Sequence, residues 1–242
     1  MSSVTDTDRL LFNVEDGVAT ITLNYPEKLN AFNNEMLFAW RARLEECRDR
    51  DDVGVIVVTG AGRGFCSGGD TGGMGRSSEL SPREAKESLQ TTVQPIGLTL
   101  QTIDKPVIAA LNGVAAGAGL DMALHCDIRY AAASARFAET YTRVGLVPGN
   151  GAAWTLPRIV GVQRALEMLW TAKFVDAQKA KEIGLVLDVF PDDTFMNDVM
   201  AIAKQIAKNA PISVRYIKRL VYQGQNMDLR THFDEVSSHM IV

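Results

Sequence analysis

The chain has 242 residues, of which 46% are hydrophobic and 22% charged, and its formal net charge is −4. This composition is typical of a soluble globular protein with one large domain, or one domain and a smaller appendage. A negative net charge without a basic face argues against nucleic acid and anionic membranes as partners.

The N-terminal part of the chain predicts a hairpin, a helix and a buried strand. Residues 10–23 (LLFNVEDGVATITL) indicate two short strands around an Asp-Gly turn signal. A polar loop follows, and Asn33 or Asn34 can cap a helix whose apolar residues recur at intervals of three and four. Residues 53–60 (VGVIVVTG) are a nearly continuous β-branched run, which is typical of a strand buried on both faces.

The middle of the chain continues the alternation of helix and strand. Residues 82–103 are mostly helical in pattern, with Ser81 as N-cap and Pro82 at the first helical position. Residues 105–113 (KPVIAALNG) predict a second buried strand, which ends in a glycine loop and the helix that contains Asp121. Short strands and helices then follow, ending in one helix–strand unit.

Strand, loop and helix therefore alternate through residues 1–190, whereas residues 191–242 are helical in pattern. This order predicts an α/β core with a parallel sheet and a helical C-terminal appendage. No linker and no low-complexity tract separates the two parts.

Cysteine usage and the N-terminus bear on the compartment. Cys47, Cys66 and Cys126 are odd in number and lack C-x-x-C spacing, which predicts a reduced protein without a structural zinc site. The N-terminal residues carry acids where a secretion signal has a basic region, and no stretch approaches the ~18 apolar residues of a membrane span. We therefore expect a cytoplasmic protein.

Two glycine-rich loops follow the buried strands, and neither has the spacing of a nucleotide site. Gly60, Gly62 and Gly64 fall at relative positions one, three and five, whereas a dinucleotide fingerprint needs one, three and six. The loop with Gly113, Gly117 and Gly119 also misses that spacing, and the chain contains no phosphate-binding P-loop motif.

A different role for these loops is main-chain recognition of an oxygen. Glycine lets a ligand approach the backbone closely, and two loops at neighbouring strand ends can each offer one N–H group to a developing oxyanion. Tight turns also use glycine, so the residues alone leave both interpretations open.

Four segments carry a recognisable signature: NYPEKLNAF, GFCSGGD, the stretch from Lys105 to Gly161, and DAQKAKEIGLV. Together they resemble the crotonase superfamily, also called the enoyl-CoA hydratase/isomerase family, over nearly the whole chain. One departure is Tyr25, which separates Asn24 from Pro26 where the family has an adjacent Asn-Pro pair.

The resemblance implies a fold and an assembly. The fold is a spiral of repeated ββα units, here residues 1–190, which carries the acyl-CoA site. The helical region, residues 191–242, is expected to serve oligomerisation as a homotrimer or a homohexamer.

The resemblance also implies an acyl-CoA thioester as substrate, with its carbonyl oxygen between the main-chain N–H groups of Gly69 and Ala118. Coenzyme A is part of that substrate, so we expect no separate cofactor and no metal. The residues expected along the CoA moiety are Lys28, Ala31, Ser67, Gly68, Gly69, Asp70, Thr71 and Gly72. The acyl pocket is expected to depend on residues 74–94, which show no readable specificity code.

In hydratases of this family two glutamates share the addition of water, and the two matching positions here hold Asp121 and Tyr141. Asp121 lies in an apolar helix, where burial can raise its pKa and let it transfer protons alone. Tyr141 has an ordinary pKa near 10, so we expect it to support the site through its phenol. Glu139 is the nearest other acid, and we expect it to be solvated, as charged loop residues usually are.

These residues fit several activities. Hydration is the first interpretation, and double-bond isomerisation with Asp121 as the single acid is the second. A crotonase-fold protein that binds acyl-CoA without catalysis is a third, and a thioesterase or decarboxylase is a fourth.

Other reactive residue types are interpreted as structural. His125 shares a helix face with Asp121, but a hydrogen bond to an acid or carbonyl in the core is favoured over a catalytic pair. Cys66 has no evident histidine partner, and Ser67 lacks a G-x-S-x-G elbow, which argues against both as nucleophiles. Asp70 is expected to anchor its loop through backbone N–H groups.

Two histidines and two tryptophans are expected to have structural or interface roles. His232 and His239 lie seven residues apart in the last predicted helix, and we expect surface or subunit contacts for them rather than a metal site. Trp154 and Trp170 are expected to be core or interface aromatics.

Overall fold

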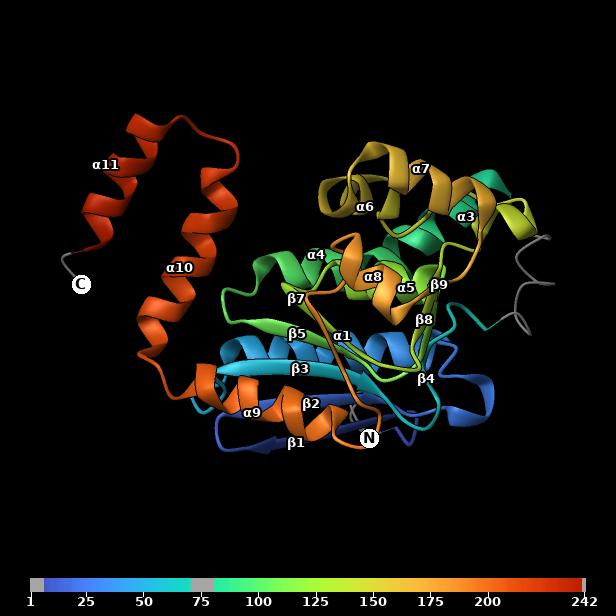
Figure 1. Ribbon diagram of the computed structural model, residues 1–242, viewed down its shortest axis with the longest axis horizontal. Coiled ribbons are helices and arrows are strands. Elements are labelled where there is room, and N and C mark those ends of the chain that lie inside the picture. The colour runs from blue at the N-terminus through green and yellow to red at the C-terminus, as the bar shows by residue number, and fades with distance from the viewer. Residues whose placement is uncertain (1–6, 71–80, 241–242) are drawn as a thin grey trace.

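The computed structural model describes residues 7–70 and 81–240 of the chain. Figure 1 shows strands surrounded by helices, with two C-terminal helices that project away from the rest. The strands are β1 (Leu10–Glu15), β2 (Val18–Leu23), β3 (Val55–Gly60), β4 (Gly64–Cys66), β5 (Val107–Leu111), β6 (Val114–Ala116), β7 (Ile128–Ala132), β8 (Arg136–Ala138), β9 (Val175–Asp176) and β10 (Asp188–Phe190). The helices are α1 (Asn34–Asp49), α3 (Pro82–Ser88), α4 (Gln94–Thr102), α5 (Ala118–Leu124), α6 (Ala152–Val160), α7 (Val162–Thr171), α8 (Ala177–Glu182), α9 (Phe195–Ala207), α10 (Pro211–Gly224) and α11 (Leu229–His239).

The described strands form two sheets. The larger has the order β1-β2-β3-β5-β7-β10 and the smaller β4-β6-β8-β9. The β1–β2 hairpin is antiparallel, and the other neighbours in the larger sheet are parallel, as predicted. The consecutive pairs β3–β4, β5–β6 and β7–β8 each run first in the larger sheet and then in the smaller one. This repeat is the ββ part of the predicted spiral.

Glycines at the corners let the two sheets approach each other. A Cβ atom at Gly60, where β3 ends, would lie 2.3 Å from the carbonyl oxygen of Gly64. A Cβ at Gly113, between β5 and β6, would lie 2.2 Å from the carbonyl oxygen of Arg63. Neither distance is tolerable, so these two glycines serve backbone packing.

The central strands β3 and β5 of the larger sheet are buried on both faces. Val55 and Val57 of β3 belong to a cluster that includes residues of α9, whereas Ile56 and Val58 belong to the main core together with Trp40 of α1. The β-branched run around residues 53–60 therefore is a doubly covered strand, as its sequence predicts.

The predicted helix starts are confirmed at two places. Asn33, rather than Asn34, caps α1, and its side chain accepts a hydrogen bond from the N–H of Met36 at 2.9 Å. Ser81 and Glu84 form a capping box at the start of α3, whose first residue is Pro82.

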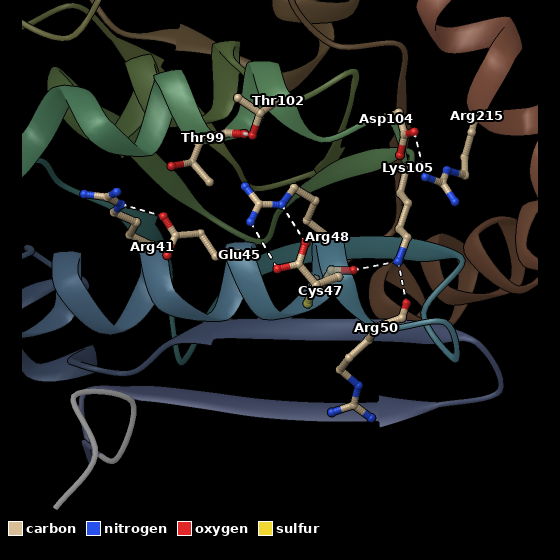
Figure 2. A network of polar contacts seen from close by, with 11 residues as sticks. Arg41, Glu45, Cys47, Arg48, Arg50, Thr99, Thr102, Asp104, Lys105 and Arg215 are labelled. Atoms are coloured by element: carbon tan, nitrogen blue, oxygen red, sulfur yellow. Dashed lines mark hydrogen bonds and ion pairs between the residues drawn. The ribbon is translucent and has the colours of Figure 1, made fainter.

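A buried lysine joins α1 to the strand that follows α4. Lys105 is 4% exposed, and its Nζ donates to the carbonyl oxygens of Cys47 (2.8 Å) and Arg50 (2.5 Å). Figure 2 shows this side chain reaching the last turn of α1, with the ion pair between Asp104 and Arg215 of α10 close by. Lysine thus satisfies carbonyl groups that the end of a helix leaves without donors.

The C-terminal helices differ in how they pack. Phe195, Val199 and Ala203 of α9 are buried against the larger sheet, whereas α10 and α11 have no buried residue. Polar contacts join α10 to the core, among them Lys218 to Asp127 at 2.7 Å. Among the described residues, every helix is too short or too polar to span a bilayer. The division of the chain at residue 190 stays a prediction.

Candidate active site

The site lies where two neighbouring strands of the smaller sheet end. β4 and β6 are parallel, with Cys66 opposite Ala115, so the segments that follow them start side by side. Gly68 has φ +99°, and a Cβ added there would lie 3.2 Å from the carbonyl oxygen of Ala116 and 3.6 Å from the nitrogen of Ala118. A Cβ at Gly119 would lie 2.2 Å from the carbonyl oxygen of Cys66. The small residues at the start of α5 are therefore required for contact with the loop after β4.

The two N–H groups predicted for the oxyanion belong to these adjacent loops. Within the described residues, neither the N–H of Gly69 nor that of Ala118 donates a hydrogen bond, and both residues are half-buried. The N–H groups beside them are held: Asp70 donates to Phe32 at 2.9 Å and Gly117 to Ala138 at 2.8 Å. Two unpaired donors on fixed backbone are suited to an oxygen that gains charge during a reaction.

Asp121 and Tyr141 are brought together, although twenty residues separate them. Asp121 lies in the first turn of α5 and is fully buried, and Tyr141 opens a 3₁₀ turn, Tyr141–Val144. The Tyr141 hydroxyl donates to Oδ2 of Asp121 at 2.6 Å. Burial raises the pKa of Asp121 to about 6, and the hydrogen bond from Tyr141 opposes that rise.

Tyr141 is a donor at this site and not a base. Its pKa is raised above the ordinary tyrosine value, first by burial and then by the charge of Asp121 and their hydrogen bond. The phenol therefore keeps its proton at neutral pH. This agrees with the expectation that Tyr141 supports the site, and its catalytic role stays a prediction.

The expectation for the environment of Glu139 is wrong. Glu139 was expected to be solvated, but it is fully buried directly after β8. Because β6 and β8 are parallel, with Ala116 opposite Ala138, the residues that follow them meet, and Glu139 contacts Asp121. The pKa of Glu139 is raised well above its ordinary value, first by burial and then by the charge of Asp121.

A signal for Glu139 exists in the sequence, but it is weak. The residue comes directly after a short apolar strand, and the carboxyl ends of parallel strands gather at one edge of a sheet. Without the strand pairing, nothing distinguishes it from an acid in a surface loop.

His125 is a core histidine, as expected. Its Nε2 lies 2.8 Å from the carbonyl oxygen of Asn150, so the ring bonds to the main chain and not to Asp121. The ring fills space left by two glycines, since a Cβ would lie 2.7 Å from it at Gly97 and 3.2 Å from it at Gly151. Burial lowers the pKa of His125, which favours the neutral ring.

The predicted CoA-binding residues that the structure describes form one cluster. Lys28 Nζ pairs with Oδ2 of Asp70 at 2.7 Å, and the Ser67 hydroxyl donates to the carbonyl oxygen of Lys28 at 3.1 Å. Ala31 is buried beside them, and the Asp70 carboxylate raises the pKa of Lys28. The Asp70 carboxylate pairs with a lysine side chain, and the backbone role expected for it stays a prediction. Thr71, Gly72 and residues 74–80 of the expected acyl-pocket region lie outside the described residues.

Asn30, which was not among the predicted site residues, fixes this cluster. Asn30 is fully buried with φ +56°, and its Nδ2 donates to the carbonyl oxygens of Ala61 (2.9 Å) and Gly64 (2.7 Å). Its Oδ1 accepts from the N–H of Tyr25 at 2.7 Å. The Arg9 guanidinium covers the Tyr25 ring at 3.6 Å. The loop with the inserted tyrosine is therefore still tied to the strand ends.

The structure also describes the cysteine, histidine and tryptophan side chains that the sequence analysis assigned to structural roles. Burial raises the pKa of the Cys66 thiol to about 12, so it is a poor nucleophile. His239 packs edge-on against Tyr216, with ring centroids 4.6 Å apart. Trp154 and Trp170 are 54% and 70% exposed, so a core role for them is wrong, and an interface role stays a prediction.

A recess of about 710 Å³ separates α10 from the core, but it is not at the carboxyl pair. Its lining includes Leu124 and His125, at the end of α5 opposite Asp121. The carboxyl pair and the loops after β4 and β6 are not part of that lining.

Comparison with known proteins decides the family. Residues 13–240 match the enoyl-CoA hydratase/isomerase family. The chain belongs to this family. It is similar to the 1,2-epoxyphenylacetyl-CoA isomerase of Escherichia coli K12, with 37% identity over 229 residues that cover 93% of this chain and 86% of that protein. It is also similar to the short-chain-enoyl-CoA hydratase of Clostridium acetobutylicum, with 33% identity over 225 residues that cover 93% and 85%.

The fold of this chain is also similar to those of solved structures from the same family. The crystal structure of an enoyl-CoA hydratase from Bacillus anthracis has a TM-score of 0.86 and 31% identity, covering 96% of this chain and 89% of that one. The crotonase fold expected from the sequence motifs is thereby confirmed. A hydratase and an isomerase both occur among the relatives of this family member.

Proposed function

We propose that this member of the enoyl-CoA hydratase/isomerase family acts on an unsaturated acyl-CoA thioester and adds water to its C=C bond or moves that bond. The observation that carries the proposal is the position of Asp121, a buried acid with a pKa of about 6 beside two unpaired N–H groups. The N–H groups of Gly69 and Ala118 would hold the thioester oxygen, and Asp121 would transfer the proton.

Hydration proceeds through an enolate. The oxygen of water bonds to C3 while the C=C electron pair moves onto the thioester oxygen, where the two N–H groups stabilise the new charge. The proton released by water goes to the carboxylate of Asp121, which then returns it to C2. The net change is addition of one water, and Asp121 ends in its starting state.

Isomerisation uses the same parts without water. Asp121 removes a proton from the carbon next to the double bond, the electrons delocalise onto the thioester oxygen, and the proton returns to a different carbon. A carboxyl group with a pKa close to the working pH is suited to both accepting and returning that proton. Tyr141 orients the carboxylate through its hydrogen bond to Oδ2.

Coenzyme A enters this proposal as part of the substrate. We assign Lys28, Ala31 and the segment 67–72 to the CoA moiety from the family motifs. The clustering of Lys28, Ala31 and residues 67–70 at the strand ends supports this assignment. The proposed steps move only protons and one electron pair within substrate and water. They therefore require neither a metal nor a redox cofactor.

We also propose a homotrimer or homohexamer in the cytoplasm. Apolar side chains on the projecting helices support assembly, since Ile217 of α10 and Phe233 of α11 are each 60% exposed. Trp154 of α6 and Trp170 of α7 are further exposed apolar side chains. The three cysteines are free, which is usual for a protein of a reducing compartment. Light scattering after size-exclusion chromatography measures the assembly, and a monomer at micromolar concentration would contradict it.

The activity is tested by incubating the protein with a panel of enoyl-CoA thioesters in D₂O and measuring products by mass spectrometry. Hydration adds one water, whereas isomerisation incorporates deuterium without adding water. Release of free CoA or CO₂ would replace the proposal by a thioesterase or decarboxylase. No turnover of any thioester, with the ligands still bound, would replace it by a binding protein.

A further inference from the structure

Two buried carboxyl groups lie in contact at the site, and most of their oxygens lack a donor. Within the described residues, Oδ1 of Asp121 and both Oε atoms of Glu139 have no hydrogen-bond partner, whereas Oδ2 of Asp121 accepts from Tyr141. Both side chains are fully buried. Buried polar atoms without partners are costly and require an explanation.

No positive charge compensates this pair among the described groups around it. The Arg136 guanidinium on β8 lies 4.9 Å from the Phe174 ring, and Arg143 donates to the carbonyl oxygen of Ala172. His125 on α5 bonds to the Asn150 carbonyl. Two adjacent carboxylates in such surroundings repel each other strongly.

The other groups that face the pair are uncharged or distant. Arg158 of α6 lies over the Trp154 ring at 4.0 Å, and the Cys66 thiol of β4 is neutral because burial raises its pKa. The main-chain N–H groups of Asn150 and Ala152 face Asp121 and favour its charged form. They act on Asp121 and not on Glu139, so the two carboxyl groups are not equivalent.

We propose that Asp121 and Glu139 hold a single proton between them, which resides on Glu139 and is donated to Oδ1 of Asp121. Two carboxylates cannot donate to each other, but a protonated Glu139 supplies the donor that Oδ1 lacks. The inference rests on the proposed function, in which Asp121 is the group that contacts the substrate. Glu139 acts through Asp121 and is a positioning residue.

The shared proton gives the pair an acid and a base at once. In hydration, Asp121 accepts the proton of water as its oxygen bonds to C3, and the pair then carries two protons. One proton passes from Asp121 to C2 of the enolate, and the pair returns to one proton. Tyr141 occupies the position of the second family glutamate, and Glu139 provides the second carboxyl from two residues earlier.

The proposal predicts a specific pH dependence. Asp121 must be ionised to act as base, which sets the acidic limb of kcat/KM. Loss of the Glu139 proton at higher pH removes the donor to Oδ1 and places a second negative charge beside the forming enolate, which sets an alkaline limb. The pKa of Glu139, well above its ordinary value, agrees with such a limb.

The test compares wild type with Glu139→Gln, whose amide donates to Oδ1 but cannot ionise. Wild type should lose at least about tenfold in kcat/KM from its optimum to the alkaline end of the range in which it stays folded, and Glu139→Gln less than about twofold. The acidic limb should remain in both. The matched control is Glu182→Gln on α8, an exposed glutamate whose loss should leave the wild-type profile unchanged. The same alkaline limb in Glu139→Gln and wild type would overturn the proposal.

Infrared spectroscopy tests the proton without any turnover. At pH 7 wild type should show the C=O stretch of a buried, protonated carboxyl that persists in Asp121→Asn and is lost in Glu139→Gln. Absence of that band in wild type would overturn the proposal even if Glu139→Gln failed to fold. A band present in a protein that turns over no enoyl-CoA would refute the proposed function and leave the shared proton standing.

Discussion

Lys105 and Glu139 are both buried ionisable residues, but the surroundings of their polar atoms differ. Lys105 Nζ donates to two carbonyl oxygens at the end of α1, so its polar head is hydrogen-bonded (Figure 2). Within the described residues, Glu139 has no donor to either oxygen unless it shares a proton with Asp121. Lys105 stabilises the fold, whereas Glu139 is held in an environment that costs stability. Burial of a charged group alone therefore does not identify a functional residue; a buried carboxyl group without a donor beside a second carboxyl group is the stronger indication.

Asp121→Asn should produce the largest effect on activity. An amide cannot accept and return the proton, so turnover should fall by at least about 10²-fold, while binding of CoA esters stays largely intact. Steady-state kinetics and calorimetric titration with a CoA ester measure the two quantities. Asp16→Asn, in the exposed β1–β2 turn, is the matched control and should keep wild-type turnover. Near-normal turnover in Asp121→Asn would contradict the assignment of this residue.

Lys105→Met should lower the stability of the protein and leave its activity unchanged. The methionine preserves most of the apolar stem but leaves the carbonyl oxygens of Cys47 and Arg50 without their donor, which should lower the free energy of unfolding by about 2 kcal/mol. Urea denaturation measures this change, and kcat/KM of the folded variant should equal that of wild type. A loss of kcat/KM in fully folded Lys105→Met would show that Lys105, like Glu139, affects activity, and would contradict its purely structural role.

Glu139→Gln should stabilise the protein at neutral and higher pH. A carboxyl whose pKa is raised by folding contributes its stability below the unfolded pKa of about 4.3 and loses it as pH rises toward the folded value. The variant lacks this loss, so its advantage should grow above about pH 4.3 and exceed about 1 kcal/mol, or roughly 2–4 °C in Tm. Thermal unfolding from pH 4 to pH 8 measures the difference. An advantage that does not change with pH would contradict the buried carboxyl.

Tyr141→Phe should have the smallest effect. The phenol lowers the pKa of Asp121 through its hydrogen bond, so its removal should raise that pKa and move the acidic limb of kcat/KM to higher pH. Well above that limb, kcat should change by only about threefold to tenfold, because the proton-transfer group is still present. An acidic limb at the wild-type position would show that the hydrogen bond does not tune Asp121.

Much of the scaffold can be predicted from local sequence patterns. The β-branched run of β3, the Asn33 cap and the Ser81 capping box depend on residues close in the chain, and the structure confirms them. The core environment of His125 was also predicted, because its helix is apolar around it.

The prediction fails where the outcome depends on strands distant in sequence. Glu139 follows only three residues of strand, and its burial comes from the parallel pairing of β8 with β6. Trp154 and Trp170 are large apolar side chains of the kind found in cores, but they lie on helix faces that the described residues do not cover. Pattern alone cannot show which face of a helix stays open.

The sequence by itself determined the family, the spiral of strand pairs and the position of one acid three residues after Ala118, because motifs and hydrophobic periodicity are properties of contiguous residues. Only the tertiary structure decided the partners of that acid. Strand pairing and loop packing place Tyr141 and Glu139 against Asp121, and they bury both carboxyl groups while Tyr141 stays half-buried. Desolvation and the contact between two carboxyl groups then set their pKa values, and both arise from residues that meet only in the folded chain.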